Sequence, residues 1–278
     1  MTDEVRIEKL GGLTNQNYLV KIKEGRYVFR FPGEGTENMI NRHNEKTHEL
    51  LANKIGITVP LLFFDDNAGI KVTAYIDDTQ TMNENSMKDR DNLSLAAKVL
   101  KTLHDCGEDT KIAFNVFDMI EDYEKLLKTS DEIVFYDDYS EIKAKVLAYR
   151  SEIENAHIKP VPCHNDPLCE NWLRSGNHMY LIDWEYAGMN DGIWDLADVS
   201  IEAGLPASSD EYFLHEYFGR NATEAELRRF HINKVFLDFL WSLWGKLRAM
   251  YHEEGMEEYA LNRYIRAKKN ISIIERAQ

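Results

Sequence analysis

The stretch that decides the fold is His164-Asn165-Asp166-Pro167-Leu168-Cys169-Glu170-Asn171, followed at residues 180–185 by Tyr-Leu-Ile-Asp-Trp-Glu. The apolar triplet at 180–182 predicts a short strand, so we expect Asp183 at the end of that strand, facing out of the core. A loop and a short hairpin then bring Asp166, Asn171 and Asp183 together. Hard oxygen donors of this kind suit Mg²⁺, which binds few protein carboxylates and completes its shell with phosphate and water.

Phosphoryl transfer needs metal ligands, a carboxylate that orients the acceptor hydroxyl, and positive groups on the phosphates. In that division Asp166 addresses the hydroxyl as the base, while Asn171 and Asp183 hold the metal. Each of these residues taken alone is more simply a turn residue or a helix cap. Their joint spacing, H-x-D-x₄-N followed by an apolar run and Asp, favours the catalytic interpretation.

Upstream of this stretch the sequence predicts strands and turns interrupted by one helix. Glu24-Gly25 is a hairpin signal, Gly56 is suited to end a helix, and Asp65-Asp66-Asn67 is typical of a turn. The predicted strands are 18–22, 27–31, 61–64 and 70–76, and the predicted helix is 38–54.

Beyond about residue 77 the pattern becomes helical. Apolar residues recur at helical spacing from Leu93 to Leu103 and again from Phe117 to Leu127, and residues 140–153 are a polar helix candidate. From Thr223 onward the chain is almost wholly helical in pattern, opened by the capping-box sequence Thr223-Glu224-Ala225-Glu226. The segment 161–200 between these helices is polar and is expected to be loop-like.

Composition narrows the classes of partner. The formal charge of −15, from 48 acidic and 33 basic side chains, argues against nucleic acid or an anionic membrane and suits a cationic ligand. The three cysteines form no CxxC pair and no metal-ligand spacing, which indicates reduced thiols. The first residues lack an apolar signal region, and no run approaches the ~20 residues of a membrane span. We therefore expect a soluble, cytoplasmic protein.

The chain resembles the choline/ethanolamine kinase family, within the aminoglycoside-phosphotransferase-like branch of the protein-kinase-like superfamily. His164-Asn165-Asp166-x₄-Asn171 matches the catalytic loop of that family, and 181–187 (Leu-Ile-Asp-Trp-Glu-Tyr-Ala) matches its metal-binding segment. Asp195 matches a structural aspartate that supports the catalytic loop. The resemblance covers residues 9–268 and implies a bilobal α+β fold, with a β-rich ATP-binding lobe at 1–77 and a mainly helical catalytic and choline-binding lobe at 78–278.

The resemblance extends to the nucleotide site. The loop 11–17 (Gly-Gly-Leu-Thr-Asn-Gln-Asn) resembles the phosphate-covering loop, although it lacks the G-x-G-x-x-G spacing and is equally consistent with an ordinary turn. Glycines let backbone N–H groups approach phosphate oxygens, and neutral side chains add donors. Arg30 stands where other kinases place a lysine, with Glu45 as its expected partner. The expected nucleotide-site residues are Gly12, Thr14, Asn15, Asn17, Arg30, Glu45 and the hinge residues Tyr75 and Ile76.

A predicted helix in the C-terminal part of the chain gives information about the acceptor. Trp241 and Trp244 are three residues apart and therefore share a helical face. From this spacing alone, the simpler interpretation is that both tryptophans are core residues. The resemblance favours a choline pocket instead, since F-L-W-x-L-W is a choline kinase feature and aromatic faces bind quaternary ammonium groups. By the same match Tyr259 joins the aromatic wall and Glu202 supplies its acidic side.

We therefore expect an ATP- and Mg²⁺-dependent choline kinase that acts as a monomer or homodimer. The short chain is more similar to bacterial relatives than to eukaryotic ones. Ethanolamine and aminoglycoside kinases on the same scaffold remain alternatives, as does a non-catalytic choline-binding protein, although the presence of Asp166, Asn171 and Asp183 argues against the last. A protein kinase is disfavoured because no Asp-Phe-Gly to Ala-Pro-Glu segment follows Asp183.

Overall fold

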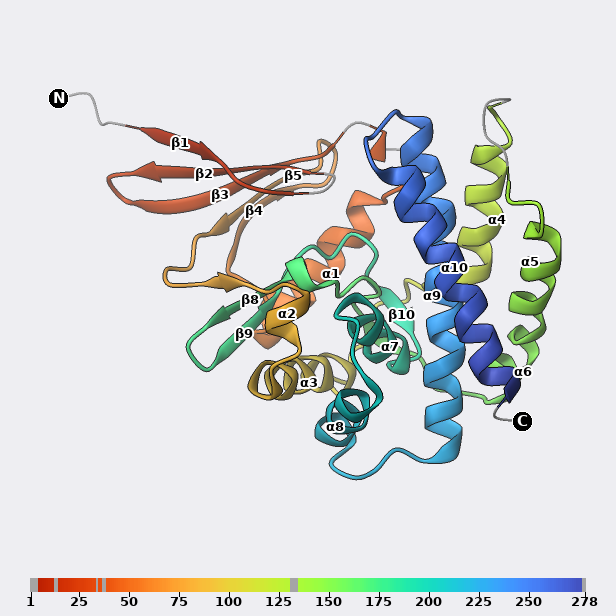
Figure 1. The fold of residues 1–278 in the computed structure, drawn as a ribbon. Coiled ribbons are helices and arrows are strands. Elements are labelled where there is room, and N and C mark those ends of the chain that lie inside the picture. Colours follow the sequence, from red (N-terminus) through yellow and green to blue (C-terminus); the bar gives the residue numbers. More distant parts are fainter. Residues whose placement is uncertain (1–4, 13–14, 34, 37–38, 131–134, 277–278) are drawn as a thin grey trace.

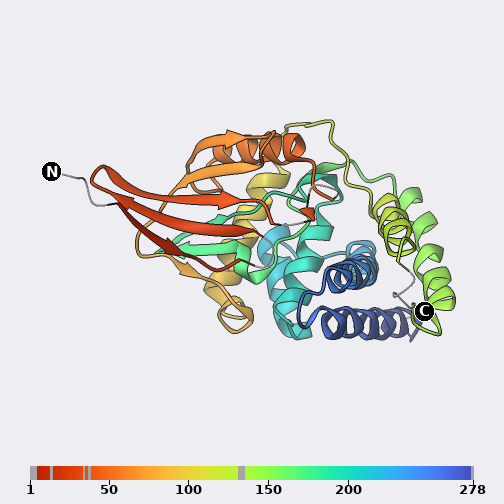
Figure 2. The same ribbon diagram turned by 90° about the horizontal axis from the view of Figure 1, so that it is seen from above.

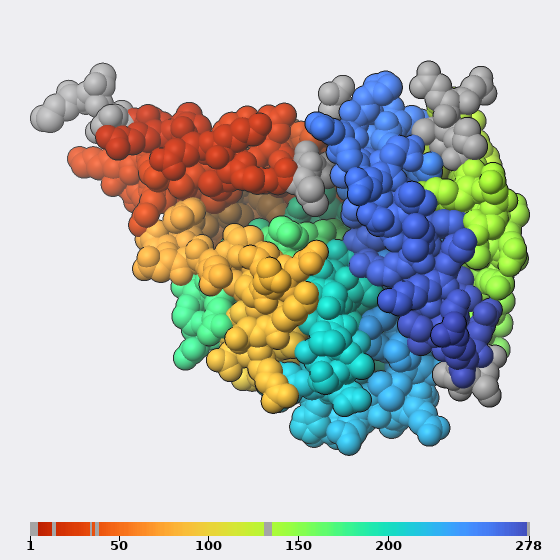
Figure 3. All heavy atoms as spheres, in the orientation of Figure 1, coloured from red at the N-terminus to blue at the C-terminus, as the bar shows by residue number. Residues whose placement is uncertain are grey.

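The computed structural model describes residues 5–12, 15–33, 35–36, 39–130 and 135–276. An antiparallel sheet with one helix beside it forms one end of the molecule, and helices form most of the rest (Figure 1). The view from above places the sheet and the C-terminal helices at opposite ends (Figure 2). In the space-filling view the N-terminal strands (red) and the last helices (blue) are likewise distinct masses (Figure 3).

The N-terminal sheet has the strand order β1-β2-β3-β5-β4, in which every neighbouring pair is antiparallel. All four predicted strands are present, and the Asp65 side chain accepts backbone N–H bonds from Asn67 and Ala68 in the predicted turn. The register of β3 and β5 pairs Arg30 with Lys71. The bounds are β1 (Arg6–Lys9), β2 (Gln16–Ile22), β3 (Gly25–Phe31), β4 (Leu61–Asp65) and β5 (Ile70–Ala74).

The helix beside this sheet is α1 (Arg42–Ile55), which begins four residues later than predicted. The Asn41 side chain caps its first turn by accepting N–H bonds from His43 and Asn44. Gly56 ends the helix with φ 76°, in the left-handed conformation that glycine adopts without penalty, as predicted. Glu45 and Glu49 are thereby placed one turn apart, and both are buried.

The second part of the chain is built around α9, which is buried along most of its length and packs against α4, α7 and α10. The predicted capping box at Thr223 and Glu226 is confirmed. The helices are α2 (Glu84–Met87), α3 (Arg90–His104), α4 (Val116–Leu127), α5 (Tyr139–Ala148), α6 (Arg150–Asn155), α7 (Ile193–Glu202), α8 (Ala207–Phe218), α9 (Glu224–Met250) and α10 (Met256–Arg276).

Two sequence predictions for this part were wrong in detail. The polar helix predicted at 140–153 is divided into α5 and α6. The segment 161–200, expected to be loop-like, contains four short strands before α7 begins at Ile193. This helix is buried at every position from Ile193 to Ile201, so it lacks the one-sided apolar stripe that marks a surface helix in a sequence.

Two small sheets carry the polar stretch between His164 and Glu185. One has the order β6-β8-β9 and the other pairs β7 with β10. Their strands are β6 (Gln80–Thr81), β7 (Val161–Cys163), β8 (Trp172–Ser175), β9 (His178–Leu181) and β10 (Gly188–Asn190), and a short 3₁₀ helix spans Cys169–Asn171. Asp183 lies two residues after Leu181, the last residue of β9, so the strand ends one residue earlier than the predicted triplet 180–182. No helix among the described residues is long and apolar enough to cross a bilayer. The division into lobes at residue 77 stays a prediction.

Candidate active site

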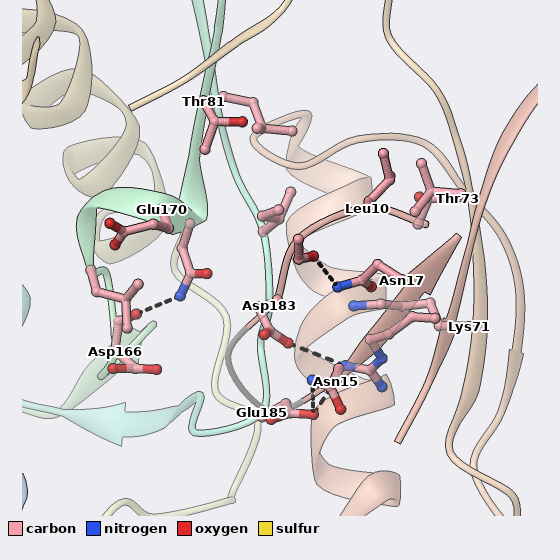
Figure 4. A pocket seen from close by; sticks show the side chains of 18 of the residues that line it. Leu10, Asn15, Asn17, Lys71, Thr73, Thr81, Asp166, Glu170, Asp183 and Glu185 are labelled. Atoms are coloured by element: carbon pink, nitrogen blue, oxygen red, sulfur yellow. Dashed lines mark hydrogen bonds and ion pairs between the residues drawn. The ribbon is translucent and has the colours of Figure 1, made fainter. Parts of the chain in front are cut away.

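A cavity of about 720 Å³ is lined by residues from both the N-terminal sheet and the helical part. Most of the predicted site residues line it: Gly12, Asn15, Asn17, Arg30, Tyr75, Ile76, Asp166, Asn171, Asp183, Trp241, Trp244 and Tyr259. Thr14 lies outside the described residues. Among those described, Glu45 and Glu202 do not line the cavity wall. Figure 4 shows Asp183 and Glu185 between Asp166 on one side and Asn15, Asn17 and Lys71 on the other.

The loop that carries Asp166 is held in place by hydrogen bonds to Asp195 of α7. The Asp195 carboxylate accepts the backbone N–H of His164 and of Asn165, each at 2.8 Å, and contacts His104 Nε2 at 3.1 Å. Asn165 has φ 67°, a left-handed conformation that is uncommon outside glycine and is found at functional sites. The predicted supporting role of Asp195 is confirmed by these contacts.

Two further hydrogen bonds connect the segments that carry Asp166, Asn171 and Asp183. The Asn171 side-chain amide donates to the Asp166 backbone carbonyl at 2.9 Å. His164 Nε2 lies 3.0 Å from the carbonyl oxygen of Ile182, the residue before Asp183. Burial lowers the pKa of His164 to about 4, so the ring is neutral near pH 7 and Nε2 donates to that carbonyl. The catalytic loop and the strand end are thus held as one unit.

Asp183 and its neighbours provide the oxygen-rich side of the cavity. Asp183 has φ 70°, and its side chain is 33% exposed. One oxygen from each of Glu45, Asp183 and Glu185 lies within 4.8 Å of the others. Asn171 uses its amide nitrogen in the bond to Asp166, which leaves its side-chain oxygen for another partner. This donor set fits a hard divalent cation such as Mg²⁺.

Arg30 is the cation at the centre of this group. Its guanidinium contacts Glu45 at 2.5 and 3.0 Å, Asp183 at 3.1 Å and Glu185 at 3.2 Å. The predicted pairing of Arg30 with Glu45 is therefore confirmed. Burial opposes the charge of Glu45, but Lys71 and Arg30 prevail and lower the pKa of that carboxyl to about 2.

Four charged residues around Arg30 were not assigned a role from the sequence: Lys71, Glu49, Arg42 and Glu185. Lys71, beside Arg30 in the sheet register, lies 2.7 Å from Glu49 and so forms a second buried ion pair to α1. Arg42, three residues before Glu45, contacts both Glu45 at 2.9 Å and Glu185. The i, i+3 spacing of Arg42 and Glu45 is a signal that could have been used. The contact with Glu185 could not, since it joins positions 143 residues apart.

The described part of the loop 11–17, called the glycine loop below, lines the cavity beside this group through Gly11, Gly12, Asn15 and Asn17. A Cβ atom at Gly12 would lie 2.6 Å from the Asn15 carbonyl oxygen, so only glycine fits there. The Asn15 side chain donates to Glu185 at 2.8 Å, and that of Asn17 donates to the Gly11 carbonyl at 3.0 Å. Both amides, expected to face phosphate, thus have protein partners here, and their contact with a nucleotide stays a prediction.

An aromatic wall lies at the end of the cavity that α9 and α10 provide. Trp241 and Trp244 meet edge to face at 6.2 Å between ring centroids, and Trp244 meets Tyr259 in the same way at 5.7 Å. Tyr186, which was quoted within the metal-binding segment but not assigned, meets Trp241 at 5.1 Å and also lines the cavity. Trp241 is buried and Trp244 only half-buried, so the two tryptophans differ in what they offer a ligand.

Glu202 lies behind this wall. Its carboxylate is 2.5 Å from Arg263, whose guanidinium stacks 5.0 Å from the Tyr259 ring centroid. Asp166 faces the same region, where burial and the nearby carboxylates of Glu202 and Asp183 raise its pKa well above the usual range. The acidic side expected of Glu202 is therefore already paired within the protein.

Comparison with known proteins agrees with this geometry. A family model described as choline/ethanolamine kinase matches residues 7–233. The chain is 30% identical to Protein LicA of Haemophilus influenzae over 258 residues, which is 90% of this chain and 96% of that protein. It superposes on choline kinase LicA from Streptococcus pneumoniae with TM-score 0.87 and 34% identity, covering 97% and 94% of the two chains. A structure of LicA in complex with AMP matches with TM-score 0.85 and 33% identity, covering 99% and 94%.

Proposed function

Since the chain belongs to the choline/ethanolamine kinase family, whose members are phosphotransferases with a kinase-like fold, we propose that it transfers the γ-phosphoryl group of ATP to the hydroxyl of choline. The observation that carries this proposal is the placement of an aromatic wall and a metal-type carboxylate group in one cavity, with Asp166 also lining it. A cationic alcohol held at the wall has its hydroxyl end available to Asp166.

The nucleotide would occupy the part of the cavity formed by the glycine loop, β3 and the hinge. Gly12 permits close approach of the backbone, Arg30 offers a buried guanidinium, and the Tyr75-Ile76 segment lines the wall where adenine would lie. The AMP complex of the related LicA structure supports nucleotide use by this family.

Asn171 and Asp183 would hold Mg²⁺, with Glu185 next to them. Bound Mg²⁺ neutralises charge on the transferred phosphoryl group and orients it. Arg30 touches Asp183 through one guanidinium nitrogen only, and its other nitrogen remains on Glu45. Glu45 therefore keeps the Asp183 carboxylate from being wholly engaged by Arg30.

Asp166 would accept the proton of the acceptor hydroxyl. As the choline oxygen bonds to the γ-phosphorus and the bond to the ADP oxygen breaks, the hydroxyl proton passes to the Asp166 carboxylate, which later releases it to water. The raised pKa of Asp166 makes its carboxylate a stronger base than an exposed aspartate. Asp195 and Asn171 hold the loop so that this carboxylate is oriented before the substrate arrives.

Choline is favoured over ethanolamine by the character of the wall. A quaternary ammonium group has no N–H to donate and is bound by ring faces, at about 0.5–2 kcal/mol for each ring. Trp244, Tyr259 and Tyr186 provide such rings. Ethanolamine would instead need hydrogen-bond acceptors, and the polycationic aminoglycosides would need a broad acidic groove.

The test is ADP release by the purified protein with choline, ethanolamine and kanamycin offered in parallel, with and without Mg²⁺. We expect Mg²⁺-dependent turnover with choline at the highest kcat/KM. Turnover with ethanolamine alone would remove the argument from the aromatic wall, and no turnover with any of the three would refute the kinase proposal.

A further inference from the structure

Helix α7 presents three carboxyl groups on one face. Asp195, Asp198 and Glu202 are separated by three and four residues, the spacings that place side chains in one row along a helix. Asp195 holds the catalytic loop, and Glu202 is bound to Arg263. Asp198 stands between them in this row, close enough to Asp166 and Arg263 to feel the charge of both.

Asp198 lacks the partner that buried polar groups almost always have. Its side chain is 0% exposed, and neither carboxyl oxygen has a hydrogen-bond partner among the described residues. Burial, together with the neighbouring carboxylates of Glu202 and Asp166, raises its pKa well above the usual range. These effects favour the neutral carboxyl group, and Arg263, the cation that opposes them, is itself paired with Glu202.

The charges around Asp198 do not balance. Arg263 is engaged by Glu202 at 2.5 Å and by Asp238 at 3.4 Å, and Arg266 is engaged by Asp238 at 2.7 Å. Within the described part of the chain, neither Asp166 nor Asp198 forms an ion pair, although both lie close to Glu202. An additional positive charge at this place would relieve the repulsion among these carboxyl groups.

We propose that Asp198 is a specificity residue whose carboxylate acts through its field on the cationic head of the acceptor. This inference rests on the proposed function, because the aromatic wall beside Asp166 is where that head would lie. The substrate cation supplies the missing charge, so that Asp198 ionises when the substrate binds. A quaternary ammonium group cannot donate a hydrogen bond, and a carboxyl group without donor partners acting together with ring faces suits it. Asp198 thereby performs the role first expected of Glu202, which Arg263 has already neutralised.

The decisive comparison uses Asp198→Asn with choline and with 3,3-dimethylbutan-1-ol, the uncharged alcohol of the same shape. Asparagine copies the size of the neutral acid, so the fold should persist, as thermal unfolding would verify. We expect kcat/KM for choline to fall roughly tenfold while that for the uncharged alcohol changes less than about twofold, as a through-space charge effect requires.

The matched control is Asp210→Asn on α8, where the carboxylate is bonded to Ser200 and Lys234 away from the cavity. It should leave the preference for choline over the uncharged alcohol unchanged. Equal losses on both alcohols in Asp198→Asn, or no change in their ratio, would overturn the inference. Should Asp198→Asn fail to fold, Asp198→Ser removes the same charge and is judged by the same ratio.

Failure of the proposed function is distinguishable from failure of this inference. If the wild-type protein phosphorylates ethanolamine and not choline, the acceptor assignment fails, and the ratio of ethanolamine to propan-1-ol tests Asp198 instead. If neither amine is turned over, calorimetric binding of choline and of 3,3-dimethylbutan-1-ol to the wild type and to Asp198→Asn gives the same comparison. A smaller difference between the two ligands in the variant supports the inference, and an unchanged difference overturns it.

Discussion

Replacing Glu45 by glutamine tests how the buried charges divide their work. Glu45 has no exposed side-chain surface and contacts Arg30 at 2.5 Å and Arg42 at 2.9 Å. Glutamine keeps the shape and removes the charge. Arg30, which loses one of its three carboxylate partners, should move onto Asp183 and Glu185, which it already contacts at 3.1 and 3.2 Å.

The size of the effect follows from the pKa of Glu45. That pKa falls from 4.5 to about 2 on folding, and about 1.36 kcal/mol per pKa unit gives roughly 3 kcal/mol of stability. Because the folded pKa is the lower one, this contribution is complete above pH 4.5 and is lost as the pH falls towards 2. Breaking a buried pair by removing one partner costs a similar amount, about 3–5 kcal/mol.

Two assays at pH 7.5 measure the consequences for Glu45→Gln. Urea unfolding should give a loss of about 3 kcal/mol in the free energy of unfolding. Initial rates over a range of Mg²⁺ concentrations should show a requirement raised by roughly tenfold, because Arg30 now competes for Asp183, which corresponds to about 1.4 kcal/mol.

Glu49→Gln is the matched control, one helical turn away on α1. It breaks a comparably buried ion pair, Lys71 to Glu49 at 2.7 Å, without touching Arg30. We expect a comparable loss of stability and a much smaller change in the Mg²⁺ requirement. If the two variants raise the Mg²⁺ requirement equally, Glu45 does not act by holding Arg30 away from Asp183, and the reasoning is refuted.

Four further variants test the remaining parts of the site. Asp166→Asn should lower kcat by at least about 10²-fold with choline affinity within threefold of wild type, and a small loss in kcat would exclude Asp166 as the base. Trp244→Ala should raise the choline KM by roughly tenfold, since it removes a ring and opens the wall, whereas an unchanged KM would return Trp244 to a packing role. Asp195→Ala should destabilise the protein by about 3 kcal/mol and depress kcat, because two buried N–H groups lose their acceptor; unfolding and turnover measured together check this, and retention of both would contradict it. The folded pKa of His164, about 4 against 6.5, means that the unfolded chain binds its proton first, so stability should fall as the pH drops from 6.5 to 4 by up to about 3 kcal/mol; His164→Asn should flatten that part of a stability-against-pH curve, and an equally steep curve would be inconsistent with a neutral buried ring.

Local features of the sequence were sufficient to predict several elements and site residues of this molecule. Three short-range patterns in the sequence are the spacing of Asp166 and Asn171, the strand shortly before Asp183 and the capping box at Thr223. Their chemistry depends on neighbours within a few residues, so they can be recognised before any fold is known. The pairing of Arg30 with Glu45 also emerged from the sequence, but only through the family resemblance.

The tertiary structure decided where the charges go. Whether a carboxylate is free or paired depends on groups that arrive from distant parts of the chain, and Coulomb interactions in a buried site are strong enough to reassign its role. Glu202 was expected to face the substrate, and the structure pairs its carboxylate with Arg263 from α10. Lys71 and Glu185 joined the site through sheet register and a turn that no periodicity marks.

The sequence by itself thus predicted the proposed reaction centre, because the residues of that centre lie close together along the chain. The wall proposed for the acceptor depends on the packing of α7, α9 and α10, which sets Trp244 and Tyr259 at the cavity and buries Asp198 without a hydrogen-bond partner among the described residues. Side chains far apart in sequence meet only after the helices pack, and the sign of the charge at that meeting point is a property of the assembled fold.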